Sequence, residues 1–174
     1  MAFTQISTDG IKNGTITTSD LVTNQDFTIN GVTVGKGANS VGTNTVLGEN
    51  ALDAAVTGGN NVAIGKSALT TNTSGGQNIS VGLEALKLNT TGSNNTGLGH
   101  AALQANTTAN NNTAVGRSAL ALNTTGGDNV AVGAYALDAN TTASSNTAVG
   151  YGSLGANTTG SNNVSIGFLA LDAN

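Results

Sequence analysis

The chain of 174 residues contains no cysteine and no proline, and only 8% of its residues are charged and 3% aromatic. The lack of cysteine excludes disulfides, thiol catalysis and the cysteine-containing zinc sites. The lack of proline is typical of a chain whose backbone N–H groups are nearly all used in hydrogen-bonded ladders. Because a globular domain usually carries about 25% charged residues, this composition indicates an unusual architecture.

Positive charge is scarce as well. Lys and Arg together number five, and the formal net charge is -4. Nucleic-acid binding requires clustered Lys and Arg, so no nucleic-acid partner is expected. The first residues lack the basic and apolar regions of a signal peptide, and no run of about 20 apolar residues could cross a membrane. We therefore expect a protein that is made without a secretion signal and does not insert into a membrane.

An apolar residue followed by glycine recurs at a constant spacing of 17 residues. A fixed period without insertion or deletion is typical of stacked repeat proteins, and its strict register argues against disorder. Identical units form shafts and surfaces more readily than one asymmetric pocket, so no enzymatic activity is expected. The eight pairs are Leu47-Gly48, Ile64-Gly65, Val81-Gly82, Leu98-Gly99, Val115-Gly116, Val132-Gly133, Val149-Gly150 and Ile166-Gly167.

Two aliphatic columns of the repeat are predicted to form the interior. The first is the residue before each glycine, and the second is the leucine four positions after it. Each fully buried aliphatic side chain stabilises the fold by about 1.5–3 kcal/mol, so these columns would supply most of the driving force. The leucine column comprises Leu52, Leu69, Leu86, Leu103, Leu120, Leu137, Leu154 and Leu171.

The segment before each glycine alternates in side-chain size, which predicts a short strand. Its small-residue face, represented by Ala114 with Gly116 and Ala131 with Gly133, would let another backbone approach closely. We expect this face to form the contact between chains. The segment after the glycine is ambiguous, since a second short strand and a single helical turn both fit it.

Two asparagine columns are predicted to form corners of the coil. Identical Asn side chains stacked about 4.8 Å apart can hydrogen-bond along the stack, and Asn tolerates the left-handed backbone of a sharp corner. Leucine-rich repeats need 20–29 residues per unit and propellers about 40, so neither fits a 17-residue unit. The fold class predicted is therefore all-β, a parallel β-solenoid (β-roll) of eight coils. The columns begin at Asn61 and Asn72 and recur every 17 residues to Asn163 and Asn174.

The sequence divides into three parts: residues 1–30 as an attachment or capping segment, 31–47 as an irregular lead-in coil, and 48–174 as the repeats. Strong turn signals occur at Asn13-Gly14 and Asn30-Gly31. Four apolar residues of the N-terminal part are available either to cap the solenoid or to hold a partner. They are Phe3, Ile6, Leu21 and Phe27.

These residues carry a family resemblance. Segments such as Asn112–Leu120, the recurrent Asn-Thr-Thr-Gly linkers, Phe27–Gly35 and Ile11–Thr17 resemble bacteriophage tail-fibre and virion-fibre proteins, particularly those of marine cyanophages. The repeat core resembles the head of trimeric autotransporter adhesins, whose Asn-Ser-Val-Ala-Ile-Gly motif is similar to Asn61–Gly65. This second resemblance implies a parallel β-roll with three chains to a shaft, although the present coil is longer. Together they cover residues 27–174.

Few residues fit a chemical or binding site. His100 is the only histidine, and without a second ligand or a neighbouring acid it indicates neither a metal site nor a catalytic base. No cofactor or calcium site is indicated. Tyr135, Tyr151 and Phe168 lie in variable positions near the C-terminal end. They are expected either to pack between neighbouring chains or to form a receptor-contact patch.

The function expected is that of a structural virion protein, a homotrimeric phage fibre or spike on the tail or capsid. Its partners would be two further copies, other virion proteins through the N-terminal segment, and a host cell-surface glycan or protein. A bacterial surface adhesin head and an ice- or carbohydrate-binding solenoid are the alternatives. The last strand also needs cover against edge-to-edge pairing, from a continuing chain or from another virion component.

Overall fold

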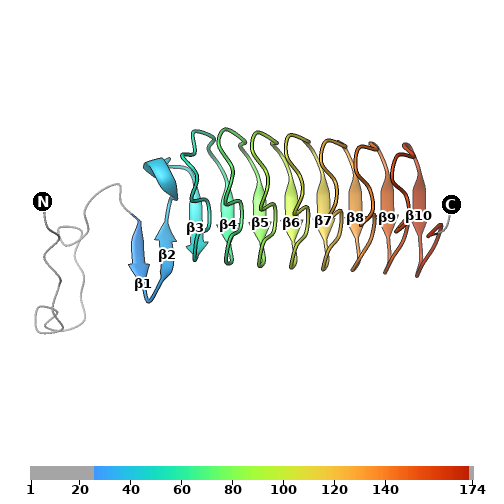
Figure 1. Ribbon diagram of the computed structural model, residues 1–174, viewed down its shortest axis with the longest axis horizontal. Helices are drawn as coiled ribbons and strands as arrows, with labels where there is room; N and C mark the ends of the chain where they lie inside the picture. The colour runs from blue at the N-terminus through green and yellow to red at the C-terminus, as the bar shows by residue number, and fades with distance from the viewer. Residues whose placement is uncertain (1–25, 173–174) are drawn as a thin grey trace, which may run out of the picture.

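The computed structural model describes residues 26–172. Ten strands form a single sheet whose spatial order is the order of the sequence, and they lie side by side along one axis (Figure 1). The strands are β1 Phe27–Ile29, β2 Val32–Gly35, β3 Thr45–Gly48, β4 Val62–Ile64, β5 Ile79–Val81, β6 Thr96–Leu98, β7 Thr113–Val115, β8 Val130–Val132, β9 Thr147–Val149 and β10 Val164–Ile166.

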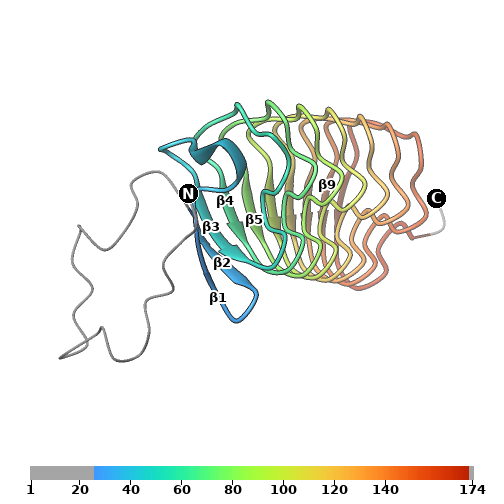
Figure 2. The same ribbon diagram turned by 60° about the vertical axis from the view of Figure 1, so that its left-hand side comes forward.

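The predicted all-β solenoid is confirmed. Strands β3 to β10 pair in parallel, and each register step is one repeat, as where Thr113 pairs with Val130 and Val115 with Val132. Seven turns of the chain therefore separate β3 from β10, and Figure 2 shows the coils stacked along the axis. No helix among the described residues is long and apolar enough to span a membrane.

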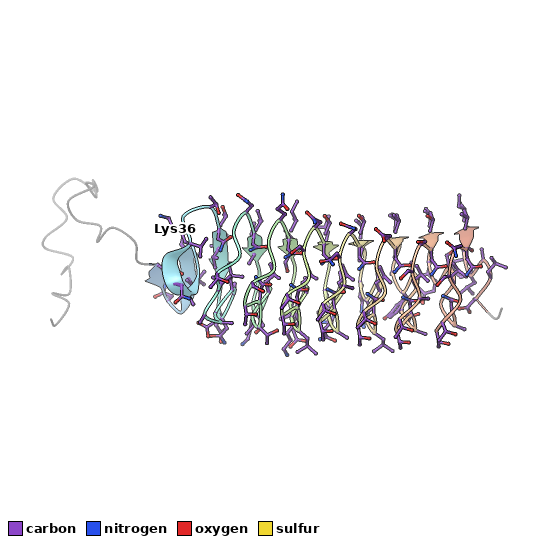
Figure 3. The ribbon with its side chains drawn as sticks, turned by 90° about the horizontal axis from the view of Figure 1, so that it is seen from above. Lys36 is labelled. Carbon is purple, nitrogen blue, oxygen red and sulfur yellow. The ribbon has the colours of Figure 1, made fainter. Side chains whose placement is uncertain are left out.

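An antiparallel hairpin precedes the coils. Strands β1 and β2 are joined at Asn30-Gly31, where both residues have positive φ, and β2 pairs antiparallel with β3. The Asp26 carboxylate accepts hydrogen bonds from the backbone N–H groups of Lys36 (2.6 Å) and Gly37 (2.8 Å), at the N-terminal end of the solenoid (Figure 3). The turn predicted at Asn30-Gly31 is thus confirmed, while Asn13-Gly14, Phe3, Ile6 and Leu21 lie outside the described residues.

The segment after each glycine is neither a strand nor a helix, so both structures considered for it are wrong. It is a run of turns in which alternate residues have positive φ, for example Ser118 at 55° and Leu120 at 52°. The amides of these two positive-φ residues donate to opposite neighbouring coils. Ser118 donates to the carbonyl of His100 in the preceding coil (2.9 Å), and Leu120 to that of Ala136 in the following coil (3.0 Å).

The interior differs from the one expected. The leucine column is buried from Leu52 to Leu154, as predicted, but Leu171 in the last coil is 47% exposed, so its assignment to the interior is wrong. The aliphatic column before the glycine points outward, with Leu98 exposed by 44% and Val132 by 37%, so its assignment to the interior is wrong. The strand column that faces the leucines begins with Val46 in β3 and then holds small residues instead: Ala63, Ser80, Gly97, Ala114, Ala131, Ala148 and Ser165.

The reason is the width of the coil. A Cβ built on Gly97 would lie only 3.4 Å from Cγ of Leu86 and 3.2 Å from the carbonyl oxygen of Ala102. From β4 onward the space between the strand and the leucine column therefore holds Ala, Ser or Gly, and a Val or Ile side chain at each of these coils would overpack it; only β3, at the N-terminal end of the parallel strands, has a valine here, Val46. The larger residues of each strand consequently occupy its outer side.

The repeated glycine has a separate cause. Gly116 has a φ of 134°, and a Cβ at this position would lie 2.6 Å from the carbonyl carbon and oxygen of Gly133 in the next coil. Any side chain would be strained and would also collide with the neighbouring backbone. This column therefore sets the close stacking of coils at the end of each strand.

Candidate functional site

The most extensive candidate surface is the outward side of strands β3 to β10, which we call the outer sheet face. Each strand contributes its first and third residues, and none of these sixteen residues is charged. Rows of side chains project from this side of the stack in the view from above (Figure 3). The residues are Thr45, Leu47, Val62, Ile64, Ile79, Val81, Thr96, Leu98, Thr113, Val115, Val130, Val132, Thr147, Val149, Val164 and Ile166.

This surface replaces the contact expected from the sequence. Ala114 and Ala131 are fully buried within their own coils and face the leucine column, so they cannot meet another chain. The prediction that the small-residue face forms the contact between chains is therefore wrong. Alternation along the strand places the apolar residues on the opposite side, which is partly exposed.

Asparagines directly before the strands of the outer sheet face bind one coil to the next through hydrogen bonds. In Asn112, Nδ2 donates to Oδ1 of Asn95 in the preceding coil (3.3 Å). Its own Oδ1 accepts from both the backbone N–H (3.0 Å) and Nδ2 (3.1 Å) of Asn129. The same pattern extends through the stack from Asn44 to Asn163, confirming the predicted asparagine column.

The second asparagine column, which starts at Asn72, forms a comparable ladder beside the first. Asn89 donates to Asn72 at 2.9 Å and Asn106 to Asn89 at 2.8 Å, and all three are fully buried. No buried side-chain N or O atom of the described residues lacks a hydrogen-bond partner. The buried polar side chains of the described residues are therefore all hydrogen-bonded.

The threonine pairs beside this ladder divide into two roles. The hydroxyl of Thr90 donates to the carbonyl of Thr107 in the next coil (3.0 Å), and Thr107 does the same to Thr124. The second member of each pair, such as Thr91 or Thr108, is exposed. Only half of these hydroxyls are thus presented to solvent, and the rest bind the backbone of the stack.

An aromatic row forms a second candidate surface near the C-terminal end. The rings of Tyr135 and Tyr151 meet edge to face with centroids 5.6 Å apart, and those of Tyr151 and Phe168 stack at 5.4 Å. The guanidinium carbon of Arg117 lies 5.4 Å from the Tyr135 centroid, in the range of a cation–π contact. Tyr151 is 48% exposed and Phe168 73%. The structure thus brings together the three aromatics singled out in the sequence and adds Arg117.

Ala134 explains how this row becomes continuous. Ala134 lies in the column directly after the glycine, between Arg117 in the preceding coil and Tyr151 in the following one. A methyl side chain there leaves space, which the ring of the adjacent Tyr135 occupies. The row therefore combines residues from two columns, a feature that spacing alone does not reveal.

Charged groups form two small clusters in the N-terminal half of the stack. Lys66 pairs with Glu49 at 3.0 Å on the surface. Glu84 accepts hydrogen bonds from Lys87 (2.7 Å) and Gln104 (2.6 Å), and the Lys87 bond is the main cause that lowers the Glu84 pKa. His100 is exposed. Among residues 26–172, no three His, Cys, Asp or Glu side chains are grouped to hold a metal ion.

Two carboxylates approach each other at the C-terminal end. A Cβ built on Gly155 would lie close to Oδ1 of Asp172 and 3.4 Å from Oδ1 of Asp138. Burial raises the pKa of Asp138, and the charge of Asp172 adds to this effect.

The sequence reasoning missed the outer sheet face, although a signal for it was present. The inner strand column is restricted to small residues over seven coils, whereas the outer columns vary among Thr, Val, Ile and Leu. A restriction on size indicates a confined space, and variation among larger residues indicates an open one. No family model, curated protein or solved structure matches the chain.

Proposed function

We propose that this chain is a shaft segment of a homotrimeric fibre or spike on a virus particle, of the kind found on bacteriophages. The observation that carries the proposal is the uninterrupted stack of 17-residue coils, bonded through every corner and bearing one uncharged apolar side. Such a unit resists bending because each coil is hydrogen-bonded to both neighbours. The assignment to a phage rests on the resemblance of the repeats and the N-terminal segments to virion fibres.

The proposed role is mechanical. The buried polar groups of the described residues are occupied in binding one coil to the next, so they are not available for chemistry on a substrate. The protein would project from the particle, attached to other virion proteins through residues that precede the first coil. Phe3, Ile6, Leu21 and Phe27 are the proposed attachment residues, and the backbone of Phe27 belongs to β1.

The distal contact proposed is the aromatic row. Exposed Tyr and Phe rings beside a guanidinium are common at binding surfaces because they supply large contact areas at small entropic cost. Their placement toward the end opposite the hairpin suits a contact with a host-surface glycan or protein. This contact is a secondary part of the proposal, and the shaft does not depend on it.

The test is localisation on the native particle. Antibody raised against residues 26–172 and labelled with gold should mark appendages of the tail or capsid in electron micrographs. Chemical cross-linking of isolated particles followed by mass measurement should give a species of three chains. Absence of the protein from purified particles would refute the virion assignment, and a monomer or dimer in intact particles would refute the trimer.

A further inference from the structure

We infer that the outer sheet face is a seam that binds further copies of this chain, aligned parallel and in register. The inference deepens the proposed function and rests on it for the presence of several copies, but it identifies the contact surface and its geometry. The seam extends over seven inter-strand steps, about 34 Å at about 4.8 Å per step.

The need for a partner follows from the exposed apolar area. Ile79 is 45% exposed and Leu98 44%, and both lie within a surface that has no charged residue to keep it apart from other chains. Monomeric proteins rarely expose apolar patches larger than a few hundred Å². An apolar sheet face of this length and regularity is expected to be covered.

A second copy fits this surface better than an unrelated protein. The outer side chains recur at each strand of the parallel ladder, so a partner must present side chains with the same rise to fill every gap. A further copy of the chain has the same spacing between successive strands, because its coils are identical. The lack of charge also removes the repulsion that like copies would otherwise experience.

The threonines determine the relative direction of the copies. In a parallel, in-register arrangement each strand faces the same strand of the other copy. Each of the threonines Thr45, Thr96, Thr113 and Thr147 can then form a hydroxyl-to-hydroxyl hydrogen bond with the same threonine of the other chain. In a fully overlapping antiparallel arrangement β3 would face β10 and β4 would face β9. In the same arrangement β6 would face β7, so Thr96 and Thr113 could still pair. Thr45 would lie against the Val164 layer and Thr147 against the Val62 layer, leaving these two hydroxyl groups without partners in an apolar contact.

The absence of cysteine makes a direct test possible. Ile64→Cys and Val149→Cys each place a single thiol on the seam near opposite ends of the stack, and Thr91→Cys places one on an exposed corner. Each variant would be treated with an oxidant and, separately, with a short bis-maleimide. Both seam variants should give covalent dimers of identical chains, and Thr91→Cys should not.

In an antiparallel seam, position 64 of one chain would not face position 64 of the other, and the same holds for position 149. Neither single variant would then form covalent dimers of identical chains. An antiparallel seam would instead join Ile64→Cys to Val149→Cys in mixed and refolded samples, and this result would overturn the parallel register. Failure of both seam variants to cross-link at concentrations where the wild type is oligomeric would overturn the seam itself.

A charge substitution provides a second measurement. Val132→Glu would bring like charges together within the seam, so light scattering should show a shift from oligomer to monomer. Leu122→Glu is the matched control, because Leu122 is exposed by 56% but lies outside the outer sheet face. Equal masses for both variants and the wild type, or a wild type that is monomeric at micromolar concentration, would contradict the inference.

These outcomes separate the seam from the proposed function. Covalent dimers at both seam positions in a protein that is absent from virus particles would retain the seam and refute the fibre. A trimer on particles whose seam cysteines do not cross-link would retain the fibre and refute the seam.

Discussion

Asn112 and Asn123 donate from their side-chain amides to the same acceptor, the carbonyl oxygen of Gly126, each at 2.9 Å. They belong to the two different asparagine ladders, so the two buried corners of neighbouring coils are joined at one backbone atom. Both side chains are fully buried. The inside of the solenoid is thus a continuous amide network flanked by a narrow apolar strip of leucines and alanines.

This network predicts a large effect of a small truncation. Asn112→Ala removes the acceptor of the Asn129 backbone N–H and side-chain amide, and one of the two donors to Gly126. Each buried polar group left without a partner costs about 1–3 kcal/mol, so the free energy of unfolding should fall by several kcal/mol. Denaturant titration measures the loss. Thr125→Ala, at an exposed site in the same corner, should change stability little.

Two adjacent residues of β7 should respond in opposite ways to changes in size. Ala114→Val adds volume to the confined interior and should destabilise each chain by about 1–3 kcal/mol. Val115→Ala removes volume from the outer sheet face, so it should leave the folded chain nearly intact and weaken association instead. Denaturant titration and light scattering on both variants check this. A destabilised chain in Val115→Ala with unchanged mass would contradict it.

Whole coils should be removable. Deleting residues 100–116 joins Gly99 to Arg117 and keeps every column in register, so a folded assembly shortened by about 4.8 Å is expected. Deleting only residues 100–108 shifts later valines and leucines to corner positions, and aggregation is expected. Circular dichroism and light scattering distinguish the two. Equal damage from both deletions would show that the sequence repeat is not the structural unit.

The raised pKa of Asp138 predicts that the stability of the folded chain depends on pH. This pKa is raised by burial, so the folded state binds the proton more tightly than the unfolded chain, whose value is near 3.8. Stability from this group is therefore greatest at acid pH and decreases as the pH rises above about 3.8, through the raised pKa. Asp138→Asn should remove this decrease and melt above the wild type at pH 7.

The matched control for that change is Asp53→Asn. Asp53 occupies the same column five positions after the glycine, but it is exposed at the opposite end of the stack. Melting temperatures of both variants and the wild type would be compared from pH 3 to pH 8. A wild-type advantage over Asp138→Asn that increases with pH would show that the sign is wrong.

The aromatic row gives a prediction that separates contact from packing. Tyr151→Ala removes both ring pairs, each worth about 0.5–1.5 kcal/mol, so a modest loss of stability is expected. If the row also contacts a host surface, binding of the purified protein to host cells should be lost at a temperature where the variant remains folded. Leu83→Ala, in the same column as Tyr151 but without ring partners, is the control.

The 17-residue repeat by itself determines the coil length, the parallel stacking and the two asparagine ladders. These features depend on identical residues meeting one coil apart, so a 17-residue period is sufficient to predict them. Asn78 above Asn61 and Asn89 above Asn72 follow directly from spacing. The hairpin at Asn30-Gly31 follows from local turn chemistry in the same way.

Only the tertiary structure decided which side of each strand is inside. Alternation separates Ala114 from Val115 but does not say which one faces the leucines, because that depends on the distance across the coil. The structure also placed Tyr135 between Arg117 and Tyr151, because the neighbouring Ala134 leaves space for its ring. The sequence period thus determines how the coils stack. The space enclosed between the strand and the leucine column determines which residues of each strand face inward and which face outward.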